Sequence, residues 1–298
     1  MNKILVNDYP LAIIINNTCN LTCSNCGSIN NYNFNGVSKW QEVKHYYEKW
    51  SELIDFGEID ILGGEPFLNP DLELWAMEIK RLWPNAWLSI GTNGTLLTLD
   101  KNIEICKRLI SAGIIIKVSC HSKAHYKEIE QTFYKLFQDY EITEDEEFSD
   151  KGESKRRFRC NGQVIAEIHE VYYFYPNFTK QVKDGIVYLD YGDQEASHSN
   201  CVYSTNTFAI QDGLFYKCPL VYTYAQGKQQ FKYEPYAQEL LEQYTACSPY
   251  DSEEKILEFF NNLTKSIPQC RLCAFEKKSK ATDKWIPITF DKRDKKMF

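Results

Sequence analysis

Short apolar segments alternate with amphipathic segments along the first half of the chain, and this alternation restricts the fold more than any other feature. Apolar runs of strand length occupy Leu11 to Ile15, Glu58 to Leu62, Ala86 to Gly91 and Gly113 to Cys120. Between them, apolar residues recur at steps of three and four, as they do on one face of a helix. Repeated units of this kind predict parallel strands in one sheet, with helices covering it.

Four helices are expected between and after these strands, near residues 40–54, 71–83, 99–111 and 126–140. The sequence also predicts where the second helix begins, because Asn69 can serve as the N-cap of a helix whose first position is Pro70. The segment from Gln163 to Phe178 resumes strand character and is expected to supply a fifth strand to the sheet. We therefore predict an α/β fold over residues 1–185.

The segment between the last helix and the fifth strand is charged throughout. Residues 141–159 are acidic first and basic afterwards, with few apolar positions. A run of this composition is typical of a solvated surface. We expect a solvated loop or a helix end there.

The regular alternation of strand-like and helix-like segments ends near residue 185. We place a second, small α+β domain at residues 186–298. Asp212 and Gly213 lie between apolar and aromatic arms and predict a β-hairpin with a type I′ turn. Two short helices are expected near residues 236–244 and 253–263. Asp251 is the expected N-cap of the second, with Glu254 three positions later.

Three of the eleven cysteines follow the first strand at the spacing Cys19-x3-Cys23-x2-Cys26. So short a loop keeps three sulfur atoms close together, which suits a metal centre. A structural zinc ion requires four ligands, and no His or Asp lies close by in the sequence. A 4Fe–4S cluster held by three thiolates instead leaves one iron open to another ligand.

The cysteine loop resembles the signature of the radical S-adenosylmethionine (AdoMet) superfamily. The resemblance implies that Cys19, Cys23 and Cys26 hold a 4Fe–4S cluster whose open iron binds AdoMet through its amino and carboxylate groups. It implies that a low-potential donor such as flavodoxin or ferredoxin supplies an electron. AdoMet is then cleaved to a deoxyadenosyl radical that abstracts hydrogen from a substrate. It also implies that residues 1–185 form a partial (β/α) barrel of the TIM type.

The same resemblance gives roles to residues at the ends of the other strands. Gly63, Gly64 and Glu65 match the motif that contacts the methionyl amine, since glycines allow close backbone approach and a carboxylate accepts from an ammonium. The position before the third cysteine is usually aromatic in the family. It is Asn25 here, and its amide is expected at the adenine edge.

Two further strand ends carry polar residues. Asn93 lies in a Gly-Thr-Asn-Gly segment, for which a plain turn and a contact with AdoMet are equally open interpretations. Ser119 or His121 is expected to face the ribose, while Cys120 should point into the core by strand alternation. Functional groups gather at the carboxyl ends of strands in βα barrels, and all four motifs occur at such ends.

A second cysteine set follows in the tail, at the spacing Cys201-x16-Cys218-x51-Cys270-x2-Cys273. Four thiolates can hold either a closed 4Fe–4S cluster or a structural zinc ion, and the spacing does not separate these. The arrangement is similar to the twitch domain, a shortened SPASM domain that follows some radical SAM barrels. That similarity implies a second, auxiliary 4Fe–4S cluster in residues 186–298.

An auxiliary cluster makes sense when the net reaction is oxidation, because a substrate radical must then lose one more electron. We therefore expect oxidation of a small alcohol or sugar-like molecule, with no catalytic residue assigned. His169 or Glu170 on the fifth strand is a hypothesis for the proton acceptor. The alternatives are radical modification of a peptide or protein side chain, and a zinc-binding structural protein on a degenerate barrel. The first strand begins about ten residues into the chain, which counts against a leader-peptide domain and hence against a peptide substrate.

The net charge of −7 predicts no nucleic-acid partner and no anionic membrane surface, because both need a basic face. The apolar run near the N-terminus is too short for a membrane span or a signal peptide. We expect a cytoplasmic protein. In that reducing compartment its cysteines serve as metal ligands or core residues rather than as disulfides.

Overall fold

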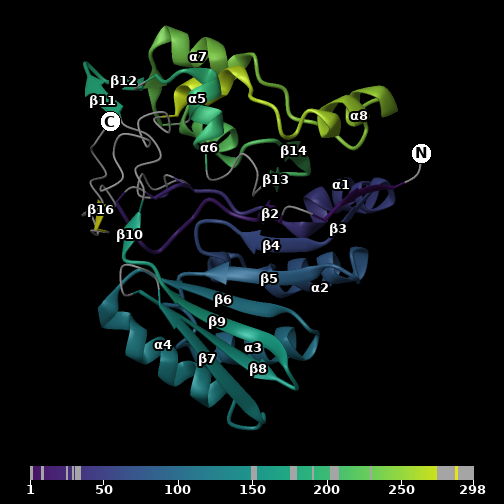
Figure 1. The fold of residues 1–298 in the computed structure, drawn as a ribbon, viewed down its shortest axis with the longest axis vertical. Helices are drawn as coiled ribbons and strands as arrows, with labels where there is room; N and C mark the ends of the chain where they lie inside the picture. Colours follow the sequence, from purple (N-terminus) through teal and green to yellow (C-terminus); the bar gives the residue numbers. More distant parts are fainter. Residues whose placement is uncertain are drawn as a thin grey trace.

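A nine-stranded mixed sheet forms the centre of the molecule (Figure 1). The structure is a computed structural model that describes residues 3–7, 10–24, 26–28, 30, 35–148, 153–174, 180–189, 191–201, 208–228, 230–273 and 286–287. The strand order is β14-β13-β2-β4-β5-β6-β9-β8-β7. Six consecutive strands of this sheet are parallel. One of them, β13 (Phe208–Gln211), comes from the tail, and the other five are β2 (Leu11–Ile14), β4 (Glu58–Leu62), β5 (Trp87–Thr92), β6 (Ile115–Cys120) and β9 (Gln163–Glu170).

The predicted helices connect these five strands in order, so the alternation in the sequence is confirmed. They are α1 (Trp40–Leu53), α2 (Leu72–Leu82), α3 (Asp100–Ser111) and α4 (Lys123–Leu136). Their apolar stripes pack on the sheet, and Trp40, Tyr47 and Trp75 form an aromatic cluster between α1 and α2. The α/β prediction is correct. Within the described residues the sheet has two edges, β14 and β7, and the partial barrel stays a prediction.

The start of α2 differs from the prediction. Its N-cap residue is Asp71, and Asn69 ends a preceding 3-10 turn, η2 (Pro66–Leu68). The Asn69 amide is buried and donates to the carbonyl oxygens of Ile15 (3.0 Å) and Ser38 (3.1 Å), while its Oδ1 accepts from the Asp71 N–H. Asn69 therefore ties the loop after β4 to the loop after β2, a task that a sequence window around the helix does not reveal.

The charged segment forms a β-hairpin, so the prediction of a solvated loop or helix end is wrong. Strands β7 (Ile142–Phe148) and β8 (Ser154–Cys160) pair antiparallel, and β8 also pairs with β9. The register sets acidic residues opposite basic ones, and Arg157 contacts Asp145 (3.1 Å) and Glu147 (2.7 Å). Cross-strand pairs of opposite charge contribute to the stability of such a sheet, and Phe158 of β8 is buried against Phe133 of α4, with ring centroids 5.4 Å apart. The order of the charges, acidic and then basic, was the available signal.

The predicted hairpin at Asp212–Gly213 is confirmed, with φ of 49° and 79° at these two residues. Strands β13 (Phe208–Gln211) and β14 (Leu214–Tyr216) form its arms. Sequence analysis placed this hairpin in the second domain, yet β13 also pairs in parallel with β2 and extends the large sheet. Trp50 of α1 fixes the turn, because its Nε1 donates to the Gly213 carbonyl at 2.9 Å.

The rest of the tail builds a second, smaller core. The helices of the tail are α5 (Gln194–Ser199), α6 (Pro219–Gly227), α7 (Pro235–Glu242), α8 (Glu253–Asn261) and the 3-10 turn η3 (Pro268–Leu272). Side chains of α6, α7, η3 and strands β12 (Ile186–Leu189) and β15 (Lys232–Tyr233) make up this core. The predicted helices α7 and α8 are confirmed, and α5 and α6 were not predicted. The N-cap of α8 is Ser252 rather than Asp251, because Asp251 pairs with Lys255 and accepts from the Ser248 N–H.

The remaining strands lie outside the large sheet. One pair joins β1 (Ile4–Val6) to β3 (Ile54–Phe56), and another joins β10 (Tyr173–Phe174) to β16 (Ile286–Pro287). Strand β11 (Lys180–Lys183) pairs with β12, which also pairs with β15. Among the described helices, none combines the length and apolar character that crossing a membrane requires.

Candidate functional site

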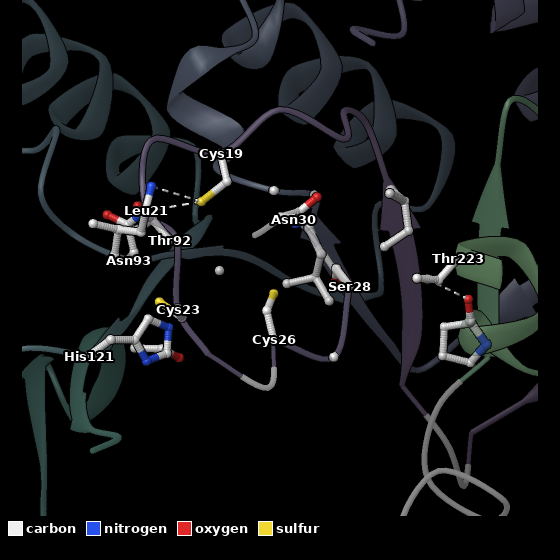
Figure 2. A pocket seen from close by; sticks show the side chains of 18 of the residues that line it. Cys19, Leu21, Cys23, Cys26, Ser28, Asn30, Thr92, Asn93, His121 and Thr223 are labelled. Carbon is white, nitrogen blue, oxygen red and sulfur yellow. Dashed lines mark hydrogen bonds between the residues drawn. The ribbon is translucent and has the colours of Figure 1, made fainter. Parts of the chain in front are cut away.

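A cavity of about 400 Å³ opens at the carboxyl ends of β2, β4, β5 and β6 (Figure 2). Parallel strands present their carboxyl ends at one edge, so loops that are far apart in sequence meet there. Eight of the predicted site residues line this cavity: Cys19, Cys23, Cys26, Gly63, Gly64, Asn93, Ser119 and His121. A volume of this size is in the range of small-molecule and cofactor sites.

The three cysteines of the first loop all line this cavity, and Figure 2 shows their side chains around its interior. Cys19 Sγ accepts from the Leu21 N–H at 3.4 Å and from Asn93 Nδ2 at 3.8 Å. Burial raises the pKa of Cys19 to about 11 and that of Cys23 to about 12, and it also raises the pKa of Cys26. Three buried or partly buried thiols that oppose each other's ionisation become thiolates once a cation binds between them.

The two glycines after β4 allow the cysteine loop to pack against them. A Cβ at Gly63 would lie 2.1 Å from Asn16 Oδ1, and one at Gly64 would lie 2.1 Å from the Thr18 carbonyl oxygen. The two loops are also joined by backbone hydrogen bonds, from Gly64 N to Asn16 O (2.9 Å) and from Glu65 N to Thr18 O (2.8 Å). The sequence analysis explained the glycines by approach to a ligand. Close packing of the two loops requires them as well.

Glu65 is fully buried and does not line the cavity. Its carboxylate accepts from the Phe67 N–H (3.1 Å), Thr92 Oγ1 (2.7 Å) and the Asn93 N–H (2.8 Å). Burial raises its pKa, and these three donors lower it. The carboxylate faces Phe67, Thr92 and Asn93 rather than the cavity, and its expected contact with a ligand amine stays a prediction. Glu65 positions Asn93, which reaches Asn20 Oδ1 (2.9 Å) and Cys19 through its amide.

Replacing Glu65 by glutamine should lower the free energy of unfolding by about 1–3 kcal/mol. A glutamine has one carbonyl oxygen, so its NH₂ group faces at least one of the backbone N–H groups that the carboxylate now satisfies. Denaturant unfolding measures the loss. Glu104→Gln is the matched control, because that exposed carboxylate pairs only with Lys107, three positions along α3. Equal stability of Glu65→Gln and Glu104→Gln would contradict this role for Glu65.

The far wall of the cavity comes from the end of β6. Ser119 and His121 line it, while Cys120 between them is buried in the core, as predicted. His121 Nδ1 lies 3.2 Å from the Val171 carbonyl oxygen, to which it donates. Burial lowers the pKa of His121. The imidazole is therefore neutral at pH 7, and its ring orientation is set by the segment after β9.

Sequence reasoning missed the residues that the tail contributes to this cavity. Pro219, Leu220 and Thr223 of α6 line it, opposite the strand ends. A signal for α6 was present, because Pro219 follows Cys218 at the first helical position and Gly227 ends the helix. Asn25, expected at the adenine edge, lies outside the described residues.

The four tail cysteines line a second, much smaller cavity of about 20 Å³. Cys201 follows α5, Cys218 precedes α6, and Cys270 and Cys273 lie in and directly after η3. The site is held by Ser197 Oγ, which donates to the Cys273 carbonyl at 3.1 Å. The structure thus brings together residues that are up to 72 positions apart, as the spacing argument expected.

Electrostatics around the tail cysteines parallel those of the first loop. Burial raises the pKa of Cys218 to about 12, and it also raises the pKa of Cys270 and Cys273, each of which opposes ionisation of the others. Lys217 is the adjacent cation, and its Nζ donates to the Asn262 carbonyl at 3.1 Å. Leu220 lines both cavities, so the first turn of α6 separates the two cysteine groups.

The donor sets fit iron–sulfur clusters in number and type. Three thiols and an adjoining cavity suit a cluster with one open iron, and four thiols suit a closed one. Among the described residues, no three His, Cys, Asp or Glu side chains are arranged to hold a single metal ion.

Comparison with protein families identifies the N-terminal part of the chain. Residues 13–137, which run from within β2 to the end of α4 and include the first cysteine loop, match the model of the Radical SAM superfamily. Proteins with this domain are enzymes of diverse reactions. No curated protein matches the chain.

The fold is shared with a solved structure, BtrN. BtrN in complex with AdoMet and 2-DOIA is similar over 92% of this chain and 94% of its own, with a TM-score of 0.50 and 17% identity. Streptococcus suis SuiB bound to S-adenosylmethionine covers 91% of this chain and 72% of its own, with a TM-score of 0.37 and 11% identity. At these identities the likeness to BtrN shows a common fold and does not extend to function.

Proposed function

We propose that this chain is a radical SAM enzyme that oxidises a small alcohol or sugar-like substrate. Cys19, Cys23 and Cys26 would hold a 4Fe–4S cluster, and AdoMet would occupy the adjoining cavity of about 400 Å³. When bound, the cluster and AdoMet supply the one-electron chemistry that abstracts a hydrogen atom from a substrate. The observation that carries this proposal is the convergence of three thiols and the Gly63–Gly64 loop on one cavity, within the segment that matches the Radical SAM superfamily.

Residues of the chain would bind and orient AdoMet from three sides. The backbone at Gly63 and Gly64 would take the methionyl amine, because its carbonyl groups can accept from an ammonium. Asn93, held by Glu65, would face AdoMet from the end of β5. Ser119 or His121 at the end of β6 would face the ribose. Each of these groups is neutral, so AdoMet would be oriented mainly by hydrogen bonds.

The tail cysteines would hold a second cluster, and this is the argument for oxidation. Cys201, Cys218, Cys270 and Cys273 supply four thiols, which leaves no iron open for a substrate. A closed cluster suits electron transfer, and Leu220 alone belongs to the walls of both cavities. An alcohol that loses a hydrogen atom and a proton must also lose one electron to become a carbonyl, and the second cluster would accept it. A reductant such as flavodoxin or ferredoxin would serve the first cluster.

Iron analysis of anaerobically prepared protein tests both sites together. About eight irons per chain are expected for two clusters. Incubation with AdoMet and a reductant should release deoxyadenosine. Four irons per chain with zinc bound to the tail cysteines would remove the argument for oxidation. A protein that binds no iron and releases no deoxyadenosine would refute the proposal that the chain is a radical SAM enzyme.

The tail site has its own test in a Cys270→Ala, Cys273→Ala double variant. This variant should keep about four irons and still cleave AdoMet, because the first cysteine loop is intact. It should not complete the oxidation of a substrate, because the radical then lacks an electron acceptor. Iron content and deoxyadenosine release measure the first expectation, and product analysis measures the second. A full complement of iron in the double variant would contradict the assignment of these ligands.

A further inference from the structure

A small side chamber opens beside the cysteine-lined cavity, between β2, β13 and α6. Its volume is about 30 Å³, which is enough for one hydroxyl or hydroxymethyl group. Several residues line both spaces, among them Ser28, Asn30, Gly63 and Thr223, so the chamber adjoins the region assigned to AdoMet. Its own wall residues are Asn17, Ala209, Gln211, Tyr222 and Gln226.

Gln211 supplies a buried polar side chain to the wall of this chamber. It is the last residue of β13, where it pairs with Ile14 of β2, and it is only 2% exposed. Its Nε2 donates to Asn17 Oδ1 at 3.2 Å, and Asn17 Nδ2 in turn donates to the Tyr222 hydroxyl at 3.0 Å. Gln211 Oε1 has no hydrogen-bond partner in the part of the chain that the structure describes.

A buried amide oxygen without a partner is unfavourable unless a ligand or a water donates to it. The chamber also offers a donor. The Tyr222 hydroxyl accepts from Asn17 and from Gln226, so its own hydrogen can be given to a third group. An acceptor and a donor in one small space match a hydroxyl group, which both donates and accepts.

The chamber is uncharged. None of the described residues that line it is acidic or basic. Asp212, the next residue after Gln211, is not part of the wall, and its carboxylate accepts from Ser38 Oγ at 3.0 Å. The Asp212 carboxylate acts on the Tyr222 hydroxyl only from outside the wall, so an ammonium group in the chamber would be desolvated without a carboxylate in contact with it, and a carboxylate there would be desolvated without a cation.

We propose that this side chamber is a specificity subsite that takes one hydroxyl of an uncharged polyol substrate, with Gln211 Oε1 as its acceptor. The inference rests on the proposed function and narrows it, because it favours neutral polyols over amino sugars and over charged peptide side chains. Gln211 is suited to this role because it lies at the carboxyl end of a strand parallel to β2, at the edge where the cysteine loop begins.

The test compares two probes that differ by one group. scyllo-Inositol presents six equivalent hydroxyls, and scyllo-inosamine replaces one of them by an ammonium. Dissociation constants are measured by ligand-observed NMR on the anaerobic, iron-loaded enzyme with AdoMet. The wild type should bind scyllo-inositol, and Gln211→Met should weaken that binding about tenfold without favouring the amine. Gln211→Glu, at pH 8, should shift the preference toward the amine about tenfold or more, because a carboxylate pairs with an ammonium.

Gln131→Glu is the control, since it adds the same charge on the exposed face of α4. Its preference should equal that of the wild type. Binding of scyllo-inositol that is unchanged in Gln211→Met would overturn the inference, because the chamber would then hold only a structural water. Absence of scyllo-inositol binding in the wild type would overturn it too. Iron content and deoxyadenosine release of the wild type report on the proposed function separately, so the two failures are distinguishable.

Discussion

Replacing Cys23 by alanine should abolish deoxyadenosine release and lower the iron content from about eight to about four per chain. Cys23 is the middle thiol of the first loop and lines the cavity between Cys19 and Cys26. Two thiols hold a four-iron cluster poorly, and the tail cysteines are untouched by the change. Iron analysis, the visible spectrum and chromatographic detection of deoxyadenosine check the result. AdoMet cleavage should fall by at least about a hundredfold, as expected when a metal site is lost.

Cys160→Ala is the matched control for this experiment. Cys160 ends β8, is partly exposed and lines neither cavity. Its replacement should leave the iron content and deoxyadenosine release of the wild type. A Cys23→Ala protein that still released deoxyadenosine would exclude the first loop as the ligand set, whatever its total iron content.

Replacing Trp50 by alanine should lower the free energy of unfolding by about 3–5 kcal/mol. Trp50 is fully buried in α1 and contacts Phe215 of the β13–β14 hairpin and Phe260 of α8, with ring centroids 5.8 and 6.2 Å away. Its Nε1 also donates to the Gly213 carbonyl, which alanine would leave without that donor. Urea unfolding followed by circular dichroism measures the loss.

Trp87→Ala provides the comparison. Trp87 starts β5, is 50% exposed, and has Lys117 Nζ 5.7 Å from its ring centroid. Its replacement should cost about 1 kcal/mol or less, because about half of the indole is already in water and Lys117 keeps its ion pairs with Glu58 and Asp60. Equal losses for the two variants would show that the hairpin is not anchored through Trp50.

The order of strands and helices in the first half was predictable, and the reason is local. Strands buried in a parallel sheet are continuous apolar runs, and covering helices carry an apolar stripe, so both patterns appear within ten to fifteen residues. Hence β2, β4, β5, β6 and the helices between them occur where expected. The β7–β8 hairpin was missed because most of its residues are charged and pair across the strands, as Arg157 does with Glu147, so its one strong apolar contact, Phe158 buried against α4, does not appear as a strand pattern in the sequence.

The cysteine residues of the two candidate sites were predictable, because their spacing along the chain indicates metal ligands. Two cysteine groups were identified from their intervals, and each lines one cavity. The role of Glu65 was not predictable, because its three donors include residues 27 and 28 positions later in the chain. The contribution of α6 to the cavity wall was also missed, since it depends on how the tail folds back over the sheet.

The amino-acid sequence by itself determined the α/β alternation, the two sets of cysteines and the placement of polar motifs at strand ends. These features depend on residue type and on intervals of a few positions, which a chain carries without folding. Only the tertiary structure decided that Glu65 is buried behind Asn93 and that the tail closes the cavity. It alone joined Asn17 to Tyr222 across 205 positions and left Gln211 Oε1 in an uncharged chamber. Such contacts depend on how strands and helices pack, whereas a local pattern such as strand alternation fixes only the face on which a side chain lies.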